Sequence, residues 1–125
     1  MRPDVDDDGF DVVVELDEVL RHVQLKGRRL GATTSTVGVH RRLSFKPNGC
    51  IVHMDYHFDN VKGLDVAYRI LGQPAGCGRL VIPATAKKAT RPGNAKKERP
   101  ETFSVRVSSF TKMDDVAELF DFLFV

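Results

Sequence analysis

Two histidines and one aspartate alternate along the chain, at His53, Asp55 and His57. In a β-strand, side chains two residues apart project from the same face, about 6 to 7 Å apart, so neighbouring members could share a metal ion. His-x-Asp is also the first part of a two-histidine, one-carboxylate iron site, for which His22 or His40 would have to supply the remaining ligand. The alternative is an exposed polar strand face. We adopt it, and predict no metal and no cofactor.

A second candidate is Cys77, which lies in a glycine-rich stretch two residues before Arg79. A thiol beside a cation can have a lowered pKa and act as a nucleophile. However, no spacing indicates a Cys–His pair, the glycines fit no phosphate-binding pattern, and no serine has the context of a nucleophile elbow. We therefore interpret the stretch as a loop between strands, predict no catalytic residue, and favour a non-enzymatic protein.

The segment from Asp4 to Glu15 fits the pattern D-x-[DN]-x-[DN]-G-x5-E and resembles the calcium loop of the EF-hand family over 12 of 125 residues. The resemblance implies a bend at Gly9 and these calcium ligands: Asp4, Asp6, Asp8, Phe10 through its carbonyl, and Glu15. Only three residues precede the loop, Asp11 replaces the usual aliphatic residue, and a strand-like run follows. The alternative is an acidic solvated arm over residues 1–11, and we predict that arm.

Basic residues are the stronger functional candidates, because phosphate contacts need charge and reach rather than fixed geometry. Our predicted nucleic-acid contacts are Lys26, Arg28, Arg29, Arg41, Arg42, Lys87, Lys88, Arg91, Lys96, Lys97 and Arg99. Aromatic side chains on which bases could stack are few, since the chain has no tryptophan. Phe45, Tyr68 and Phe103 are the candidate platforms, and each is equally compatible with burial.

The charge of the chain is segregated along the sequence. Residues 1–18 hold eight acidic residues and one basic residue, and residues 111–125 hold four acidic residues and one basic residue. Residues 19–110 hold 17 Lys and Arg against 5 Asp and Glu, a net charge of +12. A basic middle of this size suits an anionic partner: RNA or DNA, a phosphorylated surface, or the acidic ends of the protein itself.

Length and composition indicate one globular domain. With 125 residues, 42% of them hydrophobic, the chain can bury a single modest core. No apolar run approaches the roughly 20 residues of a membrane helix, and acidic residues stand where a signal peptide would be apolar. Two cysteines are too few for a disulfide framework. We expect an intracellular protein, cytoplasmic or nuclear.

Short β-like runs dominate the centre of the chain, at residues 12–14, 37–45, 50–58, 66–71, 79–82 and 103–110. Pro47, Asn48 and Gly49 have the turn chemistry of a β-hairpin and predict pairing of 37–45 with 50–58. Alternation within 50–58 predicts a core face of Val52, Met54, Tyr56 and Phe58, and an outer face of Ile51, His53, Asp55 and His57.

Two segments are less regular. Residues 17–27 fit either a short helix or a strand, and we favour the strand because strands surround it. Residues 83–102 contain three prolines, six basic residues and no large apolar side chain. Such a stretch buries too little surface to offset its ordering entropy, which predicts a mobile basic loop.

The C-terminal segment has the period of an amphipathic helix, capped from Thr111. Its predicted buried face is Met113, Val116, Ala117, Phe120, Leu123 and Phe124. We therefore predict an α+β domain over residues 12–125, with six or seven mostly antiparallel strands in a barrel or bent sheet and this helix at the end. The arrangement resembles a pleckstrin-homology-type small barrel in architecture only.

The predicted function is a non-enzymatic binding module that holds RNA or DNA on its basic surface. The alternative is a protein-interaction or structural module that acts through a sheet edge or the C-terminal helix. A third possibility is calcium binding at residues 4–15. Neither membrane insertion nor a particular oligomeric state is indicated.

Overall fold

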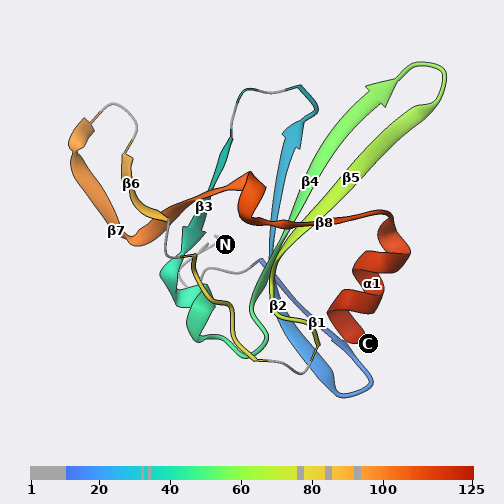
Figure 1. Cartoon of the computed structure of the whole chain (residues 1–125), viewed down its shortest axis with the longest axis horizontal. Coiled ribbons are helices and arrows are strands. Elements are labelled where there is room, and N and C mark those ends of the chain that lie inside the picture. The colour runs from blue at the N-terminus through green and yellow to red at the C-terminus, as the bar shows by residue number, and fades with distance from the viewer. Residues whose placement is uncertain (1–10, 32, 34, 76–77, 84–85, 92–93) are drawn as a thin grey trace, which may run out of the picture.

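The computed structural model describes residues 11–31, 33, 35–75, 78–83, 86–91 and 94–125, with only the backbone described for 87–91 and 94–101. The described residues form eight strands, two short 3₁₀ helices (η1 and η2) and one C-terminal α-helix (Figure 1). In chain order these are β1 (Val12–Leu16), β2 (Val19–Arg29), β3 (Thr36–His40), η1 (Arg41–Phe45), β4 (Cys50–Asp59), β5 (Gly63–Gly72), β6 (Lys87–Arg91), β7 (Asn94–Arg106), η2 (Val107–Ser109), β8 (Thr111–Met113) and α1 (Val116–Phe124).

The strands form two sheets with a helix on the outside of one of them. Sheet A has the order β1-β2-β4-β5-β8, and sheet B has the order β3-β7-β6. All described strand pairs are antiparallel except β2 with β4, which are parallel. Sheet A lies in the middle, with sheet B on one side and α1 on the other (Figure 1). The α+β class therefore holds in broad terms. The expected barrel is wrong for the described strands, because β1 and β8 remain separate edges of sheet A.

Strand β4 is the centre of the protein, since its two faces contribute to two different cores. Ile51 packs with Val39 and Val105 of sheet B in the core between the sheets. On the other face, Val52 packs with Leu119 in the core under α1. This double burial corrects the prediction that one face of 50–58 is solvent-exposed. A sequence that is apolar on alternate positions can still be covered on both faces when a second layer packs over it.

At the C-terminal end of β4, residues that were predicted to be buried are exposed. Tyr56 and Phe58, predicted to be core residues, are exposed, because β4 and β5 extend beyond both covering layers as a long hairpin (Figure 1). Neither sheet B nor α1 reaches this end of the strand pair in the view of Figure 1. The burial of a strand residue here depends on its position along the strand as well as on its face.

The turn at residues 46–49 forms, but it does not make the predicted hairpin. Asn48 has the positive φ of a turn residue (53°), yet the turn joins η1 to β4. Strand β3 pairs with β7, and β4 pairs with β2 and β5. Gly49 is required because a Cβ there would lie 2.4 Å from the carbonyl oxygen of Leu43. Turn chemistry specifies a reversal of the chain, whereas the pairing partner is set by distant residues.

The remaining segments confirm some predictions and correct others. Residues 17–27 lie mostly in β2, as favoured, after a tight turn in which Asp17 and Glu18 both have positive φ. Residues 79–82 form no strand, and 107–109 form η2 rather than the end of a strand. The described parts of 83–102 contain β6 and most of the long β7 instead of a loop, because each strand supplies the backbone partners of the other. The mobility of this segment stays a prediction.

The C-terminal helix is present, but it begins later and buries a partly different face than predicted: Met113 and Leu123 are in the core as predicted, whereas Val116 and Phe120 are exposed. Thr111 to Met113 join sheet A as β8, so the helix starts at Val116 with Asp115 as its N-cap. The Asp115 carboxylate accepts a hydrogen bond from the Glu118 N–H, and the Glu118 carboxylate accepts one from the Asp114 N–H. Leu119 is buried, with Phe122 and Leu123 against the core, whereas Phe120 is 46% exposed.

Candidate anion-binding site

A cluster of charged side chains lies on the face of sheet A that points toward sheet B. Arg28 of β2 is directly opposite Asp55 of β4, and Arg69 of β5 is directly opposite His53 of β4. Directly opposite residues of neighbouring strands share a face, and residues two apart on one strand do so as well. The strand register alone therefore places these four side chains together.

The carboxylate of Asp55 is the centre of this cluster. It is 6% exposed, with one oxygen 2.5 Å from Arg28 Nε and the other 3.6 Å from Arg69 Nε. His53 Nδ1 lies 4.0 Å from the first of these oxygens. The Nε of Arg69 and the Nδ1 of His53 are buried and have no hydrogen-bond partner among the described residues. One buried carboxylate thus faces two guanidinium groups and does not fully satisfy both.

The electrostatics of the cluster favour a charged Asp55 and a neutral His53. Burial raises the pKa of Asp55, but the Arg28 hydrogen bond and the charges of Arg28, His53 and Arg69 outweigh it, so the pKa is below its ordinary value. Burial lowers the pKa of His53; Asp55 raises it, and the two arginines lower it further. Arg28, Arg69 and Asp55 together therefore carry one net positive charge.

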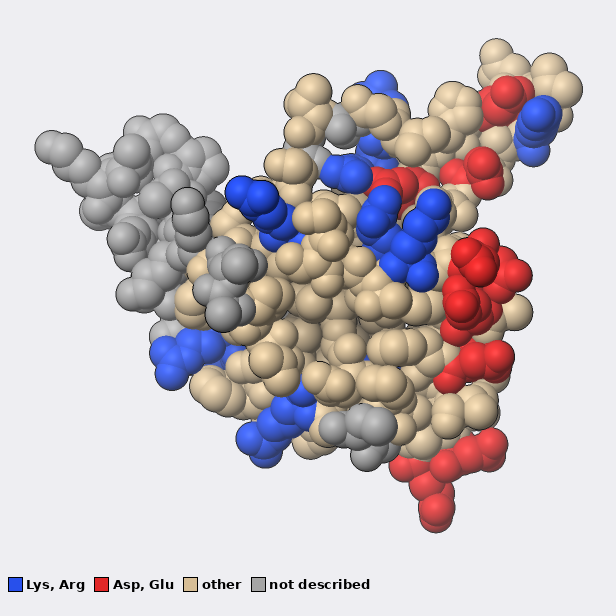
Figure 2. Space-filling model, viewed as in Figure 1, with Lys and Arg blue, Asp and Glu red and all other residues tan. Residues whose placement is uncertain are grey.

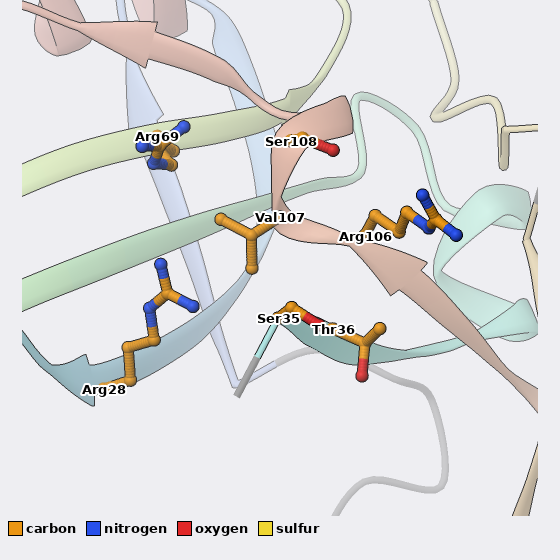
Figure 3. A pocket seen from close by; sticks show the side chains of 7 residues that line it. All are labelled: Arg28, Ser35, Thr36, Arg69, Arg106, Val107 and Ser108. Atoms are coloured by element: carbon orange, nitrogen blue, oxygen red, sulfur yellow. The ribbon is translucent and has the colours of Figure 1, made fainter. Parts of the chain in front are cut away.

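A pocket of about 500 Å³ opens beside this cluster. Its lining residues are Arg28, Arg69, Arg106, Ser35, Thr36, Ser108 and Val107 (Figure 3). Sheet B supplies Thr36 and Arg106 as direct cross-strand partners. The Val107 N–H donates a 2.9 Å hydrogen bond to the carbonyl of Ser35, which holds η2 next to the start of β3. The lining therefore consists of three cations, three hydroxyls and one apolar side chain, a composition that suits an anion.

The arginines occupy two parts of the pocket. In the view of Figure 3, Arg28 and Arg69 lie on one side of Val107, and Arg106 extends from the other side toward η1. Arg106 is exposed and has no ion-pair or hydrogen-bond partner among the described residues. Arg28 and Arg69 therefore belong to the buried Asp55 cluster, whereas Arg106 lies farther out.

The cations continue across sheet A. Lys26 is directly opposite His53, and Lys112 of β8 is directly opposite Arg69, so both share the face of the cluster. Many acidic side chains gather elsewhere: Figure 2 shows a group of them along one edge, over α1 and the β1–β2 turn, and others on the β4–β5 hairpin. The charge segregation of the sequence is thus in part also a segregation in space.

The structure brings only some of the predicted contact residues together. Lys26 and Arg28 lie in the cluster, whereas Arg29 points to the opposite face of sheet A because it is the next residue along β2. Arg41 and Arg42 are exposed on η1. The remaining predicted contacts lie on the β6–β7 ribbon, where only the backbone is described: Lys87, Lys88, Arg91, Lys96, Lys97 and Arg99.

Sequence reasoning missed the two arginines that complete the pocket, Arg69 and Arg106, and its three hydroxyls. Arg69 interrupts the apolar run of residues 66–71, and Arg106 interrupts that of 103–110. A lone arginine at the outward position of a strand is ordinary, so neither carried a signal without the sheet pairing. The sequence therefore offered no local sign by which either arginine could have been found.

Among the described residues, the other sequence candidates form no site. Among the described residues, no group of three His, Cys, Asp or Glu side chains is placed to hold a metal ion. His57 is exposed, whereas His53 and Asp55 are buried. Cys50 is a free, buried thiol whose pKa is raised by burial, which makes it a poor nucleophile. Cys77 and the segment 4–10 of the calcium-loop resemblance lie outside the described residues, and Glu15 is on β1.

The chain matches no protein-family model, no curated protein and no solved structure. Within the described residues, no helix has the length and apolar character needed to cross a membrane. A function must therefore be argued from the pocket and from the surface around it.

Proposed function

We propose that this protein is a non-enzymatic binding module that holds the phosphate groups of RNA or DNA. The observation that carries the proposal is the arginine pocket, in which Arg28, Arg69 and Arg106 from three strands meet the hydroxyls of Ser35, Thr36 and Ser108. Guanidinium and hydroxyl groups are the side-chain groups that most often contact nucleic-acid phosphates.

The surroundings of the pocket support a polymer rather than a single small anion. Lys26 and Lys112 extend the positive face across sheet A, and β7 leads from Arg106 into the basic ribbon. From Arg106 to Lys97 is nine residues, about 30 Å along a strand. Several phosphates of one nucleic-acid strand could be contacted over such a length.

Binding should depend on Arg106 and on salt. We would measure the affinity for a fluorescently labelled oligonucleotide by anisotropy at about 50 and 200 mM salt. Arg106→Gln is the suitable variant because its side chain is exposed and has no partner in the described part of the chain, so the fold should be unaffected. We expect weaker binding and a salt slope reduced by about one.

The matched control is Arg79→Gln, which removes an equal charge from an exposed arginine that does not line the pocket. It should change the affinity less than Arg106→Gln does. No binding of RNA or DNA by the intact chain, even at low salt, would reject the proposal. Equal effects of the two variants would reject the pocket as the contact site.

A protein-interaction module remains the second candidate, because α1 has exposed apolar side chains. Val116 and Phe120 lie exposed on this short helix beside its acidic residues. Such a surface suits a partner with a basic rim and an apolar centre. Loss of a co-purifying protein partner in Phe120→Asp, with nucleic-acid binding absent, would favour this function over the first.

A further inference from the structure

Phe45 is an exposed aromatic ring on a short helix that is anchored in the core. Its side chain is 53% exposed, although it ends η1, whose Leu43 is fully buried in the core between the sheets. The helix is held by local hydrogen bonds: the Ser44 hydroxyl donates to the Arg41 carbonyl at 2.6 Å, and the Arg42 N–H donates to His40 Nδ1 at 3.1 Å. A ring on such a support loses little conformational freedom when it binds a ligand.

Arg41 lies over this ring, with its guanidinium carbon 5.5 Å from the ring centroid. No aromatic ring of the described residues stacks on Phe45. An arginine over an aromatic side chain presents a flat π surface and a positive charge at one place. Proteins that bind single-stranded nucleic acid use this pair of groups, since every base has a π face and every nucleotide a phosphate.

The two other candidate platforms are less accessible. Tyr68 packs against the core under α1, and Phe103 packs against the core between the sheets. Phe45 is therefore the platform candidate that the fold leaves open.

The position of Phe45 relative to the arginine pocket is the second part of the argument. Strand β3 begins at Thr36, in the pocket lining, and leads directly into η1. The five residues of β3 span about 16 Å, a length of a few nucleotides. Arg106 extends toward η1 from the pocket (Figure 3), so positive groups lie at both ends and between them.

We propose that Phe45, with Arg41 over its ring, stacks on an unpaired base of the nucleic acid whose phosphate lies in the arginine pocket, and that the ligand is therefore single-stranded. This inference rests on the proposed function and makes it more specific. In a duplex, the bases are stacked on one another and their faces are not available to a side chain. Phosphate contacts alone would not distinguish a single strand from a duplex, because both carry phosphates.

The absence of tryptophan from the chain allows a direct test. Phe45→Trp introduces a single fluorescent indole at the proposed platform. Phe58→Trp is the matched control, because Phe58 is 66% exposed but lies near the tip of the β4–β5 hairpin and does not line the pocket. Each variant would be titrated with a single strand, with the duplex of the same sequence, and with an abasic strand of the same length.

We expect the single strand to quench the indole fluorescence of Phe45→Trp, and the abasic strand and the duplex to leave it nearly unchanged. Phe58→Trp should respond to none of the three. Phe45→Ala should weaken single-strand affinity about 5- to 100-fold, as loss of one stacked base predicts. It should leave affinity for the abasic strand unchanged, and Phe58→Ala should leave both affinities unchanged.

Two negative results have different meanings. In the first, the intact chain binds the single strand and the duplex equally and Arg106→Gln weakens both, while Phe45→Ala has no effect and Phe45→Trp is not quenched. This result overturns the stacking inference and leaves the phosphate-binding function standing. If the intact chain binds none of the three oligonucleotides, the proposed function is overturned, and the stacking inference with it.

Discussion

At the scale of single residues, the most consequential group is the Asp55 carboxylate. Strand register places it between Arg28 and Arg69, and its burial makes it the fixed counter-charge of both. A buried ion pair contributes little net stability against an apolar replacement, but removing one partner leaves the other charges uncompensated. Asp55 therefore orients the pocket arginines, and both pH effects below arise around it.

Asp55→Asn should lower the free energy of unfolding by about 1 to 3 kcal/mol at neutral pH, less than for a fully buried pair because both arginines are partly exposed. The folded-state pKa of Asp55 lies below the ordinary 3.8, so its contribution is present above that pH and is lost as the pH falls through the lowered value. In urea unfolding between pH 7 and pH 3, the free energies of unfolding of the unchanged protein and of Asp55→Asn should become more similar as the pH falls. An unchanged difference at pH 3 would contradict this account.

His53 should produce a second, milder pH dependence. Its pKa in the folded protein is below the ordinary 6.5, so the unfolded chain binds a proton at a higher pH than the folded one. Stability should therefore fall as the pH drops below about 6.5, and the fall should end once the lowered pKa is passed. In His53→Gln this part of the pH profile should be flat in thermal melts between pH 7.5 and 5. A slope equal to that of the unchanged protein would assign the effect to other groups.

At the scale of elements, the register of α1 decides which of its side chains support the fold. Because β8 takes residues 111–113, the helix presents Leu119 to sheet A and leaves Phe120 half-exposed. The fully buried Arg21 of β2 fixes the end of the same helix, since its guanidinium donates hydrogen bonds to the carbonyls of Leu123 (3.3 Å) and Gln73 (2.8 Å). A cation at the Leu123 carbonyl, in the last turn of α1, also complements the helix dipole.

Leu119→Ala should destabilise the protein by about 2 to 4 kcal/mol, because it leaves a cavity in the core under α1. Phe120→Ala should cost less than about 1 kcal/mol, because the exposed part of its ring contributes little. Denaturant unfolding of both variants checks the ranking. A larger loss for Phe120→Ala would mean that the face predicted from periodicity is the docked one.

At the scale of the whole molecule, one edge is acidic, and most basic side chains lie away from it. The acids of α1 and the β1–β2 turn lie along one edge, and the pocket and its surrounding cations lie elsewhere (Figure 2). Residues 2–10 add four aspartates and one arginine and are tethered to β1, whose preceding residue Asp11 hydrogen-bonds to Val23 and Leu25. A tethered anionic segment competes with a nucleic acid at a high effective concentration.

Deleting residues 2–10 should therefore tighten nucleic-acid binding, by about 2- to 10-fold near 50 mM salt and less at higher salt, where screening is stronger. Asp11 is retained because its carboxylate accepts the Leu25 N–H. A chain of unchanged length with Asp4, Asp6, Asp7 and Asp8 replaced by Asn is the control and should bind like the deletion. If neither change affects the affinity in an anisotropy titration, the acidic segment is not a competitor.

Local patterns in the sequence were sufficient for features that depend on neighbouring residues. The β-rich centre, the strand at residues 50–58, a turn at Asn48 and a C-terminal amphipathic helix all follow from side-chain period and backbone preference. The separation of acidic from basic segments also follows from the sequence alone. Lys26 and Arg28 were identified among the predicted contacts for that reason.

Local sequence patterns could not predict which strands pair, and the strand pairing decides which residues are buried and which line the pocket. The partner of a strand is selected by contacts between residues far apart in the chain, which no local pattern encodes. The parallel pairing of β2 with β4 and the second sheet over β4 turned an expected outer face, His53 and Asp55, into a buried charge centre. The same packing joined Arg28, Arg69 and Arg106, separated by 41 and 37 residues, around one pocket. The sequence by itself determined that the protein has a basic middle; only the tertiary structure decided which of those cations gather around one pocket.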